Sequence, residues 1–287
     1  MHYELCTVKD YALCTMNIIT KHLSQFISLL SIKICNFASM KRAIVIGASS
    51  GIGREVARLL ICDGWSVGLG ARRTDKLEQL REESVSKASD AQKIEIGAID
   101  VNSGNATEGL QILIEKTGGM DLYFHSSGVG WMNPELDEQK ELKTVETNAL
   151  GFTRMIDAVF QYMSKNRGGH IVIISSVAGT KGLGPAPAYS ATKAFQNKYI
   201  ESLEQLAATR RLNIRFTDIR PGFVATDLLN GGNNYPLLLK TDSVARKIIS
   251  AINHRRHICI IDWRWAILTA LWRGIPSFIW RKIKLTK

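Results

Sequence analysis

A tyrosine and a lysine stand four residues apart in the stretch from Ala188 to Ala194, which reads Ala-Tyr-Ser-Ala-Thr-Lys-Ala. Residues four apart share one face of a helix, so Tyr189 and Lys193 are expected to be neighbours. A free phenol has a pKa of about 10, and an adjacent ammonium lowers that pKa toward the range useful in acid–base catalysis. Because such a pair is also typical of an ordinary helix surface, the rest of the chain must decide its meaning.

The elements around this pair follow an alternating pattern. Apolar runs predict strands at 43–46, 65–69, 93–98, 121–125, 170–175, 213–219 and 257–261. Helical patterns lie between them at 51–62, 75–85, 106–116, 135–148, 152–164, 189–208 and 244–252. Strands that are apolar throughout and separated by helices indicate a sheet covered on both faces. We therefore expect a doubly wound α/β domain of the Rossmann type, with a mostly or wholly parallel sheet of about seven strands.

A glycine-rich turn joins the first predicted strand to the first helix. It reads Gly-Ala-Ser-Ser-Gly-Ile-Gly from Gly47 to Gly53. Glycines there allow the backbone to approach a pyrophosphate, whose charge is met by amides at the helix N-terminus. The alternative is a tight βα turn without a ligand. The candidate dinucleotide contacts in this turn are Gly47, Ser49, Ser50, Gly51, Ile52 and Gly53.

The end of the second strand indicates which dinucleotide is preferred. A carboxylate at that point would bind the ribose 2′-hydroxyl of NAD, but the sequence continues Gly-Ala-Arg-Arg from Gly70 to Arg73. A guanidinium matches a 2′-phosphate in charge and geometry. We therefore expect NADP(H), with Arg72 as the first candidate contact and Arg73 as the second. The alternative is a pair of solvent-exposed arginines at the start of a helix.

From Met40 to about Ile261 the chain resembles the short-chain dehydrogenases/reductases. The glycine turn resembles their T-G-x-x-x-G-x-G, and Asp100-Val101 resembles the acidic pair that meets the adenine. Asn148 begins Asn-Ala-Leu-Gly, similar to the family's N-x-x-G, and Ser176 precedes Tyr189 by thirteen residues. The segment from Pro221 to Thr226 reads Pro-Gly-Phe-Val-Ala-Thr and resembles P-G-x-V-x-T.

This resemblance implies a catalytic tetrad of Asn148, Ser176, Tyr189 and Lys193. Tyr189 would exchange a proton with the reacting oxygen while Ser176 hydrogen-bonds that oxygen. Lys193 would lower the phenol's pKa and bind the nicotinamide ribose, and Asn148 would hold a water that relays protons toward solvent. Further cofactor contacts implied by the family are Asp100, Val101, Gly128, Asn148, Tyr189, Lys193, Pro221, Gly222, Val224 and Thr226, the last of these at the nicotinamide carboxamide.

Two positions depart from the family pattern. After the fourth strand the family has N-N-A-G, whereas this chain has His125-Ser126-Ser127-Gly128. Ile46 stands where the family often has threonine. Both positions support the sheet and the cofactor pocket, so they affect binding details more than proton transfer. The sequence gives His125 no triad arrangement with Ser175 or Ser176, which disfavours a serine hydrolase.

Composition excludes several other classes. The 287 residues carry a formal charge of +11, and from Lys240 onward eleven Lys or Arg face two Asp. The basic excess is therefore largely a C-terminal property. No zinc-ligand spacing and no aromatic-rich basic strand are present, so we expect neither a metal site nor nucleic-acid binding. The five cysteines form no C-x-x-C and no disulfide framework, which favours a reducing cytoplasm.

The two ends differ from the domain, which we place at residues 40–262. Residues 1–39 lack the pattern of a secretory signal, and we interpret them as a loosely held extension, with Met40 as the alternative natural start. Residues 263–287 interleave tryptophans with arginines and lysines, a pattern that suits a membrane interface. The alternative is a helix packed over the substrate cleft or at a subunit interface.

The loops at 129–134, 178–187 and 227–239 contain many apolar side chains and few charges. We therefore expect an apolar carbonyl substrate, such as a 3-oxo lipid resembling 3-ketosphinganine. The predicted function is NADP(H)-dependent interconversion of a ketone and a secondary alcohol by a cytoplasmic homo-oligomer, a dimer or tetramer, peripheral to a membrane if the C-terminal segment binds lipid. The alternative is a non-catalytic NADP(H)-binding sensor on the same scaffold.

Overall fold

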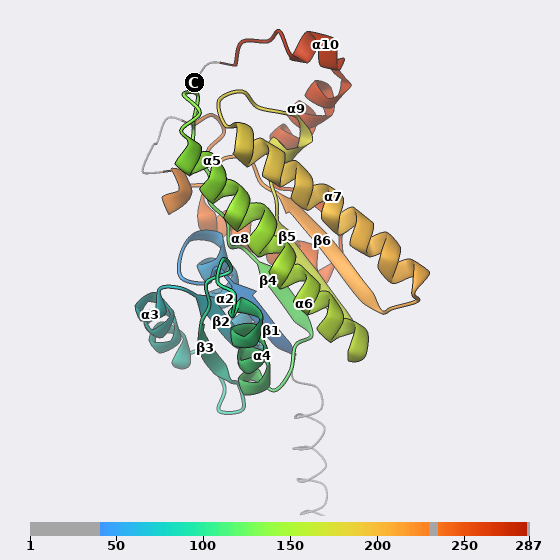
Figure 1. Cartoon of the computed structure of the whole chain (residues 1–287). Coiled ribbons are helices and arrows are strands. Elements are labelled where there is room, and N and C mark those ends of the chain that lie inside the picture. Colours follow the sequence, from blue (N-terminus) through green and yellow to red (C-terminus); the bar gives the residue numbers. More distant parts are fainter. Residues whose placement is uncertain (1–40, 230–234, 286–287) are drawn as a thin grey trace, which may run out of the picture. The chain divides into compact units, whose positions relative to one another are not determined.

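The computed structural model describes residues 41–229 and 235–285. The predicted extension at 1–39 lies outside these residues. The described chain begins with β1, and Figure 1 shows the sheet with helices lying across it. The strands are β1 (Arg42–Ile46), β2 (Ser66–Ala71), β3 (Ile94–Ala98), β4 (Leu122–His125), β5 (Gly169–Ile174), β6 (Ile214–Arg220) and β7 (Ile258–Ile260).

All seven strands pair in parallel, in the order β3-β2-β1-β4-β5-β6-β7. The expected doubly wound parallel sheet is therefore confirmed. Strand β1 lies between β2 and β4, so the chain leaves the sheet centre in both directions, and ligands in such sheets bind where the order reverses. This places the glycine-rich turn, which follows β1, directly beside the loop that follows β4.

Helices cover both faces of the sheet. They are α2 (Gly51–Cys62), α3 (Thr74–Val85), α4 (Ala106–Thr117), α5 (Glu138–Val145), α6 (Phe152–Lys165), α7 (Pro187–Thr209) and α8 (Thr241–Asn253). Successive side chains of β1 point to opposite faces: Ala43 and Val45 join the core under α2, α3 and α8, whereas Ile44 and Ile46 join the core under α4, α6 and α7. An all-apolar strand is thus required because both of its faces are buried.

The helical region before β5 differs from the expectation of two separate helices at 135–148 and 152–164. Helix α5 passes into a π-helical segment, η1 (Glu146–Gly151), which continues directly into α6. Short π segments are a recognised feature of functional sites because they change which carbonyls the helix itself uses. Asn148 lies in the middle of this segment and is fully buried.

The C-terminal segment forms α9 (Trp263–Gly274) and the short α10 (Ser277–Trp280). Its indoles bind the loop that follows β5: Trp272 Nε1 donates to Thr180 Oγ1 at 2.7 Å, and Trp280 Nε1 donates to the Gly182 carbonyl at 2.8 Å. Lys181 Nζ donates to the Ile275 carbonyl at 2.8 Å. No helix within residues 41–229 and 235–285 is long and apolar enough to cross a membrane.

Candidate functional site

The glycine-rich turn brings β1, α2 and the end of β4 into close contact. Gly47 has a φ of +89°, and a Cβ there would lie 2.8 Å from the Ser126 carbonyl carbon. Only glycine therefore fits between the two strand ends. Ser49 and Ser50 follow, and no side chain caps the N-terminus of α2. The first amides of this helix, from Gly51, Ile52 and Gly53, form a backbone cradle suited to an anion.

The two arginines after β2 are both exposed but differ in their contacts. Arg73 Nη2 donates to Ser50 Oγ at 2.7 Å and to Ser49 Oγ at 3.2 Å. Arg72, the first candidate from the sequence, makes no side-chain contact of this kind within the described residues. The structure thus brings Arg73, the second candidate, onto the glycine-rich turn, where a guanidinium lies next to the cradle.

Asp100 and Val101 lie just beyond β3. The carboxylate Oδ1 of Asp100 accepts from the amide of Asn102 at 3.1 Å, and Val101 is buried. The Val101 carbonyl accepts from Arg154 Nη1 at 2.8 Å. These contacts fix the loop at the same sheet edge as the glycine-rich turn.

The departures from the family pattern lie where β1 and β4 end side by side. The Ser126 amide donates to the Ile46 carbonyl at 2.8 Å. His125 is 1% exposed, and its Nδ1 lies 2.9 Å from the Tyr123 hydroxyl, while its Nε2 has no partner in the described structure. Burial, together with the charge of Lys193, lowers the pKa of His125 to about 3, so the ring is neutral. A neutral, buried imidazole therefore ends β4, and its ring packs edge-on against Phe152.

Four residues expected to form the tetrad come from three elements that meet at the carboxyl edge of the sheet. Ser176 follows β5, Tyr189 and Lys193 lie in the first turns of α7, and Asn148 lies in η1. Asn148 Nδ2 donates to Thr192 Oγ1 on α7 at 3.3 Å. Its Nδ2 also donates to the Val129 carbonyl at 2.7 Å and its Oδ1 accepts from the Val129 amide at 2.9 Å. The Asn148 side chain therefore connects the loop after β4 to α7 by hydrogen bonds.

Of the two serines after β5, Ser176 is the one beside the tyrosine. Its side chain acts to lower the pKa of the Tyr189 phenol, and its Oγ accepts from the Ala178 amide at 3.1 Å. Ser175 Oγ instead donates to the buried carboxylate of Asp218. The loop after β4 also closes on the phenol, because a Cβ at Gly130 would overlap the Tyr189 ring.

The protonation of the Tyr189–Lys193 pair in this ligand-free structure differs from the simple expectation. Burial raises the pKa of Tyr189 above its ordinary value, and only the hydrogen bond with Ser176 opposes the rise. Lys193 Nζ lies 5.8 Å from the centre of the phenol ring and donates to the Ile174 carbonyl at 2.9 Å. Burial lowers the pKa of Lys193 to about 8, although Asp218 opposes this. Desolvation is therefore the largest cause of the pKa shift in both groups.

The loop after β6 also lies at the carboxyl edge of the sheet. Pro221 accepts from Ser176 Oγ at 3.4 Å and from the Val177 amide at 3.1 Å. The methyl of Thr226 approaches Gly51 of the glycine-rich turn, since a Cβ on that glycine would lie 3.1 Å from it. Gly222 packs against the Trp265 indole, and Val224 is buried. The remaining expected contact, Gly128, faces the Asn148 side chain, so all the expected site residues line one edge of the sheet.

Sequence reasoning missed four buried polar residues behind this edge: Gln196 and Asn197 on α7, and Asp218 and Arg220 on β6. Arg220 Nη2 lies 2.7 Å from Asp218 Oδ2, and Gln196 Oε1 accepts from Lys193 Nζ at 3.0 Å. A signal was present in the sequence. Gln196 lies four residues before Ile200 and seven before Leu203, two core positions of α7, so a polar side chain there had to find buried partners.

Comparison with known proteins agrees with this geometry. The sequence model of the family described as short chain dehydrogenase matches residues 41–234. An uncharacterized oxidoreductase of Myxococcus xanthus is 32% identical over 83% of this chain and 94% of that protein. Among solved structures, an alcohol dehydrogenase of the archaeon Thermococcus sibiricus in complex with 5-hydroxy-NADP is 24% identical, with a TM-score of 0.69 over 78% of this chain and 96% of that one.

An actinorhodin polyketide ketoreductase variant with NADPH is also 24% identical, with a TM-score of 0.66 over 77% of this chain and 95% of that one. At this level of identity the two solved structures bear on the fold alone. The match of the family sequence model over most of the described chain and the Myxococcus relative establish descent. The chain therefore belongs to the short-chain dehydrogenase family of oxidoreductases.

Proposed function

We propose that the protein is an NADP(H)-dependent oxidoreductase that interconverts a ketone and a secondary alcohol, acting as a reductase. The observation that carries this proposal is the meeting of the Tyr189 phenol with the Ser176 hydroxyl at the carboxyl edge of the sheet, one helical turn from the Lys193 amine. A phenol next to a hydroxyl suits transfer of a proton to an oxygen that is hydrogen-bonded at the same time.

The residues of the sheet edge fit a dinucleotide phosphate. The turn from Gly47 to Gly53 offers a backbone cradle at a helix N-terminus, and a side chain at Gly47 would collide with the backbone after β4. Arg73 lies over this turn, and Arg72 is the residue before Arg73. Two guanidinium groups are therefore available for a 2′-phosphate. The NADP-type ligands of the Thermococcus and polyketide enzymes, which share the fold, support the same preference.

In this proposal the nicotinamide, when bound, supplies the hydride that reduces the carbonyl carbon. Tyr189 gives its phenolic proton to the carbonyl oxygen, or removes it from the alcohol in the reverse direction. Ser176 donates a hydrogen bond to that oxygen and stabilises its developing charge. Lys193 in its ammonium form stabilises the phenolate that Tyr189 leaves behind. Asp100, Val101, Gly128 and the segment from Pro221 to Thr226 would hold the cofactor along the edge.

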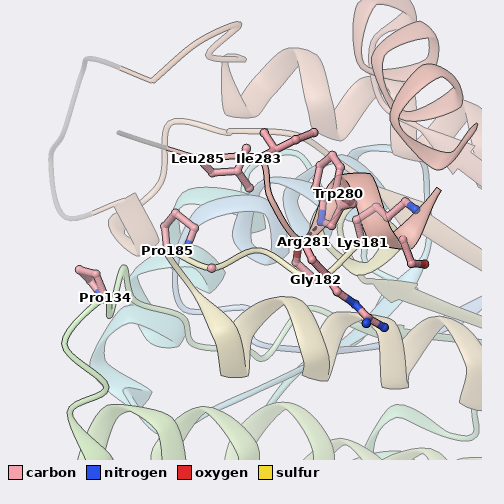
Figure 2. Close-up of a pocket in the computed structure, with 10 residues that line it drawn as sticks. Pro134, Lys181, Gly182, Pro185, Trp280, Arg281, Ile283 and Leu285 are labelled. Carbon is pink, nitrogen blue, oxygen red and sulfur yellow. Dashed lines mark hydrogen bonds between the residues drawn. The ribbon is translucent and has the colours of Figure 1, made fainter. Parts of the chain in front are cut away.

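A pocket whose lining includes none of the proposed catalytic or cofactor residues supports the proposal of an apolar carbonyl substrate. Its volume is about 610 Å³, and it lies between the loops that follow β4 and β5 and the C-terminal segment. Figure 2 shows Pro134, Pro185, Ile283 and Leu285 grouped along one side, with the cationic groups of Lys181 and Arg281 toward the other. An apolar chain with a polar or anionic group fits such a lining, which favours a 3-oxo lipid; the cations favour an uncharged or anionic polar end over the ammonium of a 3-ketosphinganine-like compound.

The outer face of α9 supports a second proposal, that the enzyme binds the surface of an anionic membrane from the cytoplasmic side. Trp263 is 70% exposed and Leu271 is 68% exposed, and Ile267 lies between them on the same helical stripe. Five Lys or Arg and only one Asp occur at 262–285. Exposed tryptophan with nearby cations suits the headgroup region of a bilayer.

We also propose that the protein is a homo-oligomer, a dimer or tetramer. Large apolar side chains remain exposed on the helical layer of α5, η1 and α7, including Leu142, Leu150, Phe195 and Leu206. A second copy of the chain would cover them.

The experiment that tests the main proposal is NADPH oxidation with a panel of ketones, measured for the wild type and for Tyr189→Phe. We expect turnover by the wild type and a fall in kcat of about 10²–10⁴-fold in the variant, because the proton donor is lost. Tyr199→Phe, on the same helix but stacked on Phe195, is the control and should keep full activity. Binding of NADPH without turnover of any ketone would favour the cofactor-sensing alternative instead.

A further inference from the structure

The side chain of Gln196 lies between two groups of the proposed site. Its Oε1 accepts from Lys193 Nζ at 3.0 Å, and its Nε2 donates to the backbone carbonyl of Asn148 at 2.9 Å. Gln196 is 1% exposed, and both ends of its amide are thus used in a region shielded from water. A buried amide that is hydrogen-bonded at both ends holds its two partners in a fixed relation.

Lys193 gains a defined position from these contacts. An ammonium has three N–H donors. One binds the Ile174 carbonyl at the end of β5 and a second binds Gln196, which leaves one for a ligand or for the phenolate of Tyr189. The amine is therefore oriented by protein atoms on two sides before any cofactor is present.

Asn148 is constrained in the same way. Its side chain is bound to both backbone groups of Val129, and its carbonyl is bound to Gln196. In the scheme implied by the family resemblance, Asn148 holds a relay water. Here the backbone carbonyl of Asn148 accepts a hydrogen bond from the side-chain amide of Gln196. An amide neither gains nor loses a proton at neutral pH, so the Gln196 side chain cannot relay protons.

We propose that Gln196 is a positioning residue that links Lys193 directly to Asn148 and takes the place of a relay water between them. The inference rests on the proposed function for its catalytic meaning, but the link itself is made by residues of the chain alone. Its consequence is that protons would reach Tyr189 from the side of the substrate and cofactor, and not through the Asn148 carbonyl.

The charged and titratable groups that face Lys193 come from three elements. Asp218 on β6 stabilises the ammonium through space, although Arg220 is paired with that carboxylate. His125 on β4 is neutral, and Tyr189 lies on the same helix as the lysine. The pKa of Lys193 lies at about 8, so the loss of one acceptor changes its protonated fraction near neutral pH.

The test compares Gln196→Leu, Gln196→Glu and Gln196→Ala, with Gln205→Leu on the exposed side of the same helix as the control. The first readout needs no turnover: the pKa of Lys193 is followed by NMR on isotope-labelled lysine, assigned by loss of its signal in Lys193→Met. We expect the pKa to fall by about one unit in Gln196→Leu and to rise in Gln196→Glu, whose carboxylate keeps an acceptor. An unchanged pKa in both variants would overturn the link.

The second readout is kcat on whichever ketone the wild type reduces. If Gln196 replaces a water, Gln196→Ala makes room for one and should retain about tenfold more activity than Gln196→Leu, which excludes water. A residue that only fills space gives the opposite order, because the larger side chain leaves the smaller cavity. Thermal unfolding identifies any variant that fails to fold. Absence of wild-type turnover counts against the proposed function alone, because the lysine titration still decides the link.

Discussion

The guanidinium of Arg73 lies across the glycine-rich turn, with its Nη2 2.7 Å from the hydroxyl of Ser50. We propose that it contacts the 2′-phosphate of NADP(H) from this position. We expect Arg73→Glu to raise the KM for NADPH by about tenfold or more, since a hydrogen bond to a charged group contributes about 1.5–3 kcal/mol. The KM for NADH should change little.

The cofactor measurement is steady-state kinetics with both nucleotides. Arg256→Glu is the matched control, because this exposed arginine precedes β7 and so lies at the opposite edge of the sheet. Equal loss of affinity for NADPH and NADH in Arg73→Glu would show that the arginine supports the turn and does not read the phosphate. Arg72→Glu, measured in parallel, assigns the share of the first candidate.

The buried pair of Asp218 and Arg220 predicts a large stability effect. Their side chains are 3% and 11% exposed, and Asp218 also accepts from Ser175. We expect Asp218→Asn to lower the free energy of unfolding by about 3–5 kcal/mol, because it leaves a buried guanidinium without its counter-charge. Urea unfolding followed by circular dichroism measures the change.

The exposed pair of Asp242 and Arg246 on α8 supplies the control for that experiment, since its ions are 2.7 Å apart but lie in water. Asp242→Asn should leave the unfolding midpoint nearly unchanged because solvent screens exposed pairs. If Asp218→Asn were as mild as this control, the buried carboxylate would not be required to neutralise Arg220.

Two histidines, the buried His125 and the half-buried His170, predict loss of stability in acid. The pKa of His125 falls to about 3 and that of His170 to about 4, from an ordinary 6.5, in both cases mainly by burial. The folded chain therefore binds fewer protons than the unfolded chain at intermediate pH. The contribution of the two neutral histidines to the free energy of unfolding is fully present above pH 6.5. It falls by about 1.4 kcal/mol per pH unit for each histidine as the pH drops toward these lower pKa values.

Urea unfolding between pH 7 and about pH 4.5 measures this slope. In His125→Asn the slope should be shallower by about 1.4 kcal/mol per pH unit, because one titrating group is gone while the carboxylates are unchanged. Parallel slopes for the wild type and the variant would mean that His125 is protonated in the folded chain.

The outer face of α9 predicts binding to anionic vesicles. We expect the full chain to float with vesicles that contain phosphatidylserine, and the double variant Trp263→Glu/Leu271→Glu to stay unbound, since it places two charges on the apolar face. Val85→Glu, an equally exposed apolar side chain on α3, is the control. Loss of flotation in the control, or persistence in the double variant, would contradict membrane binding through α9.

The sequence alone determined the features that depend on local pattern. Apolar runs between helical segments were sufficient to predict a parallel sheet. Strands of such a sheet are buried on both faces, so their side chains are apolar throughout. The turn around Gly47 and the spacing of Tyr189 and Lys193 were readable because backbone freedom and helical periodicity act over a few residues. The tetrad of Asn148, Ser176, Tyr189 and Lys193 was named from the family resemblance, which also selected Ser176 over Ser175.

Only the tertiary structure decided which distant groups touch. It brought Arg73 rather than Arg72 onto the turn and tied the C-terminal indoles to the loop after Ser176. It also joined Gln196 to Asn148 across 48 positions of sequence. Such contacts depend on how helices lie over the sheet and on which strands are neighbours, and no local pattern encodes them. The burial of a side chain also depends on these tertiary contacts. Burial raises the pKa of Tyr189, whereas the Tyr–Lys spacing alone predicted a lower pKa.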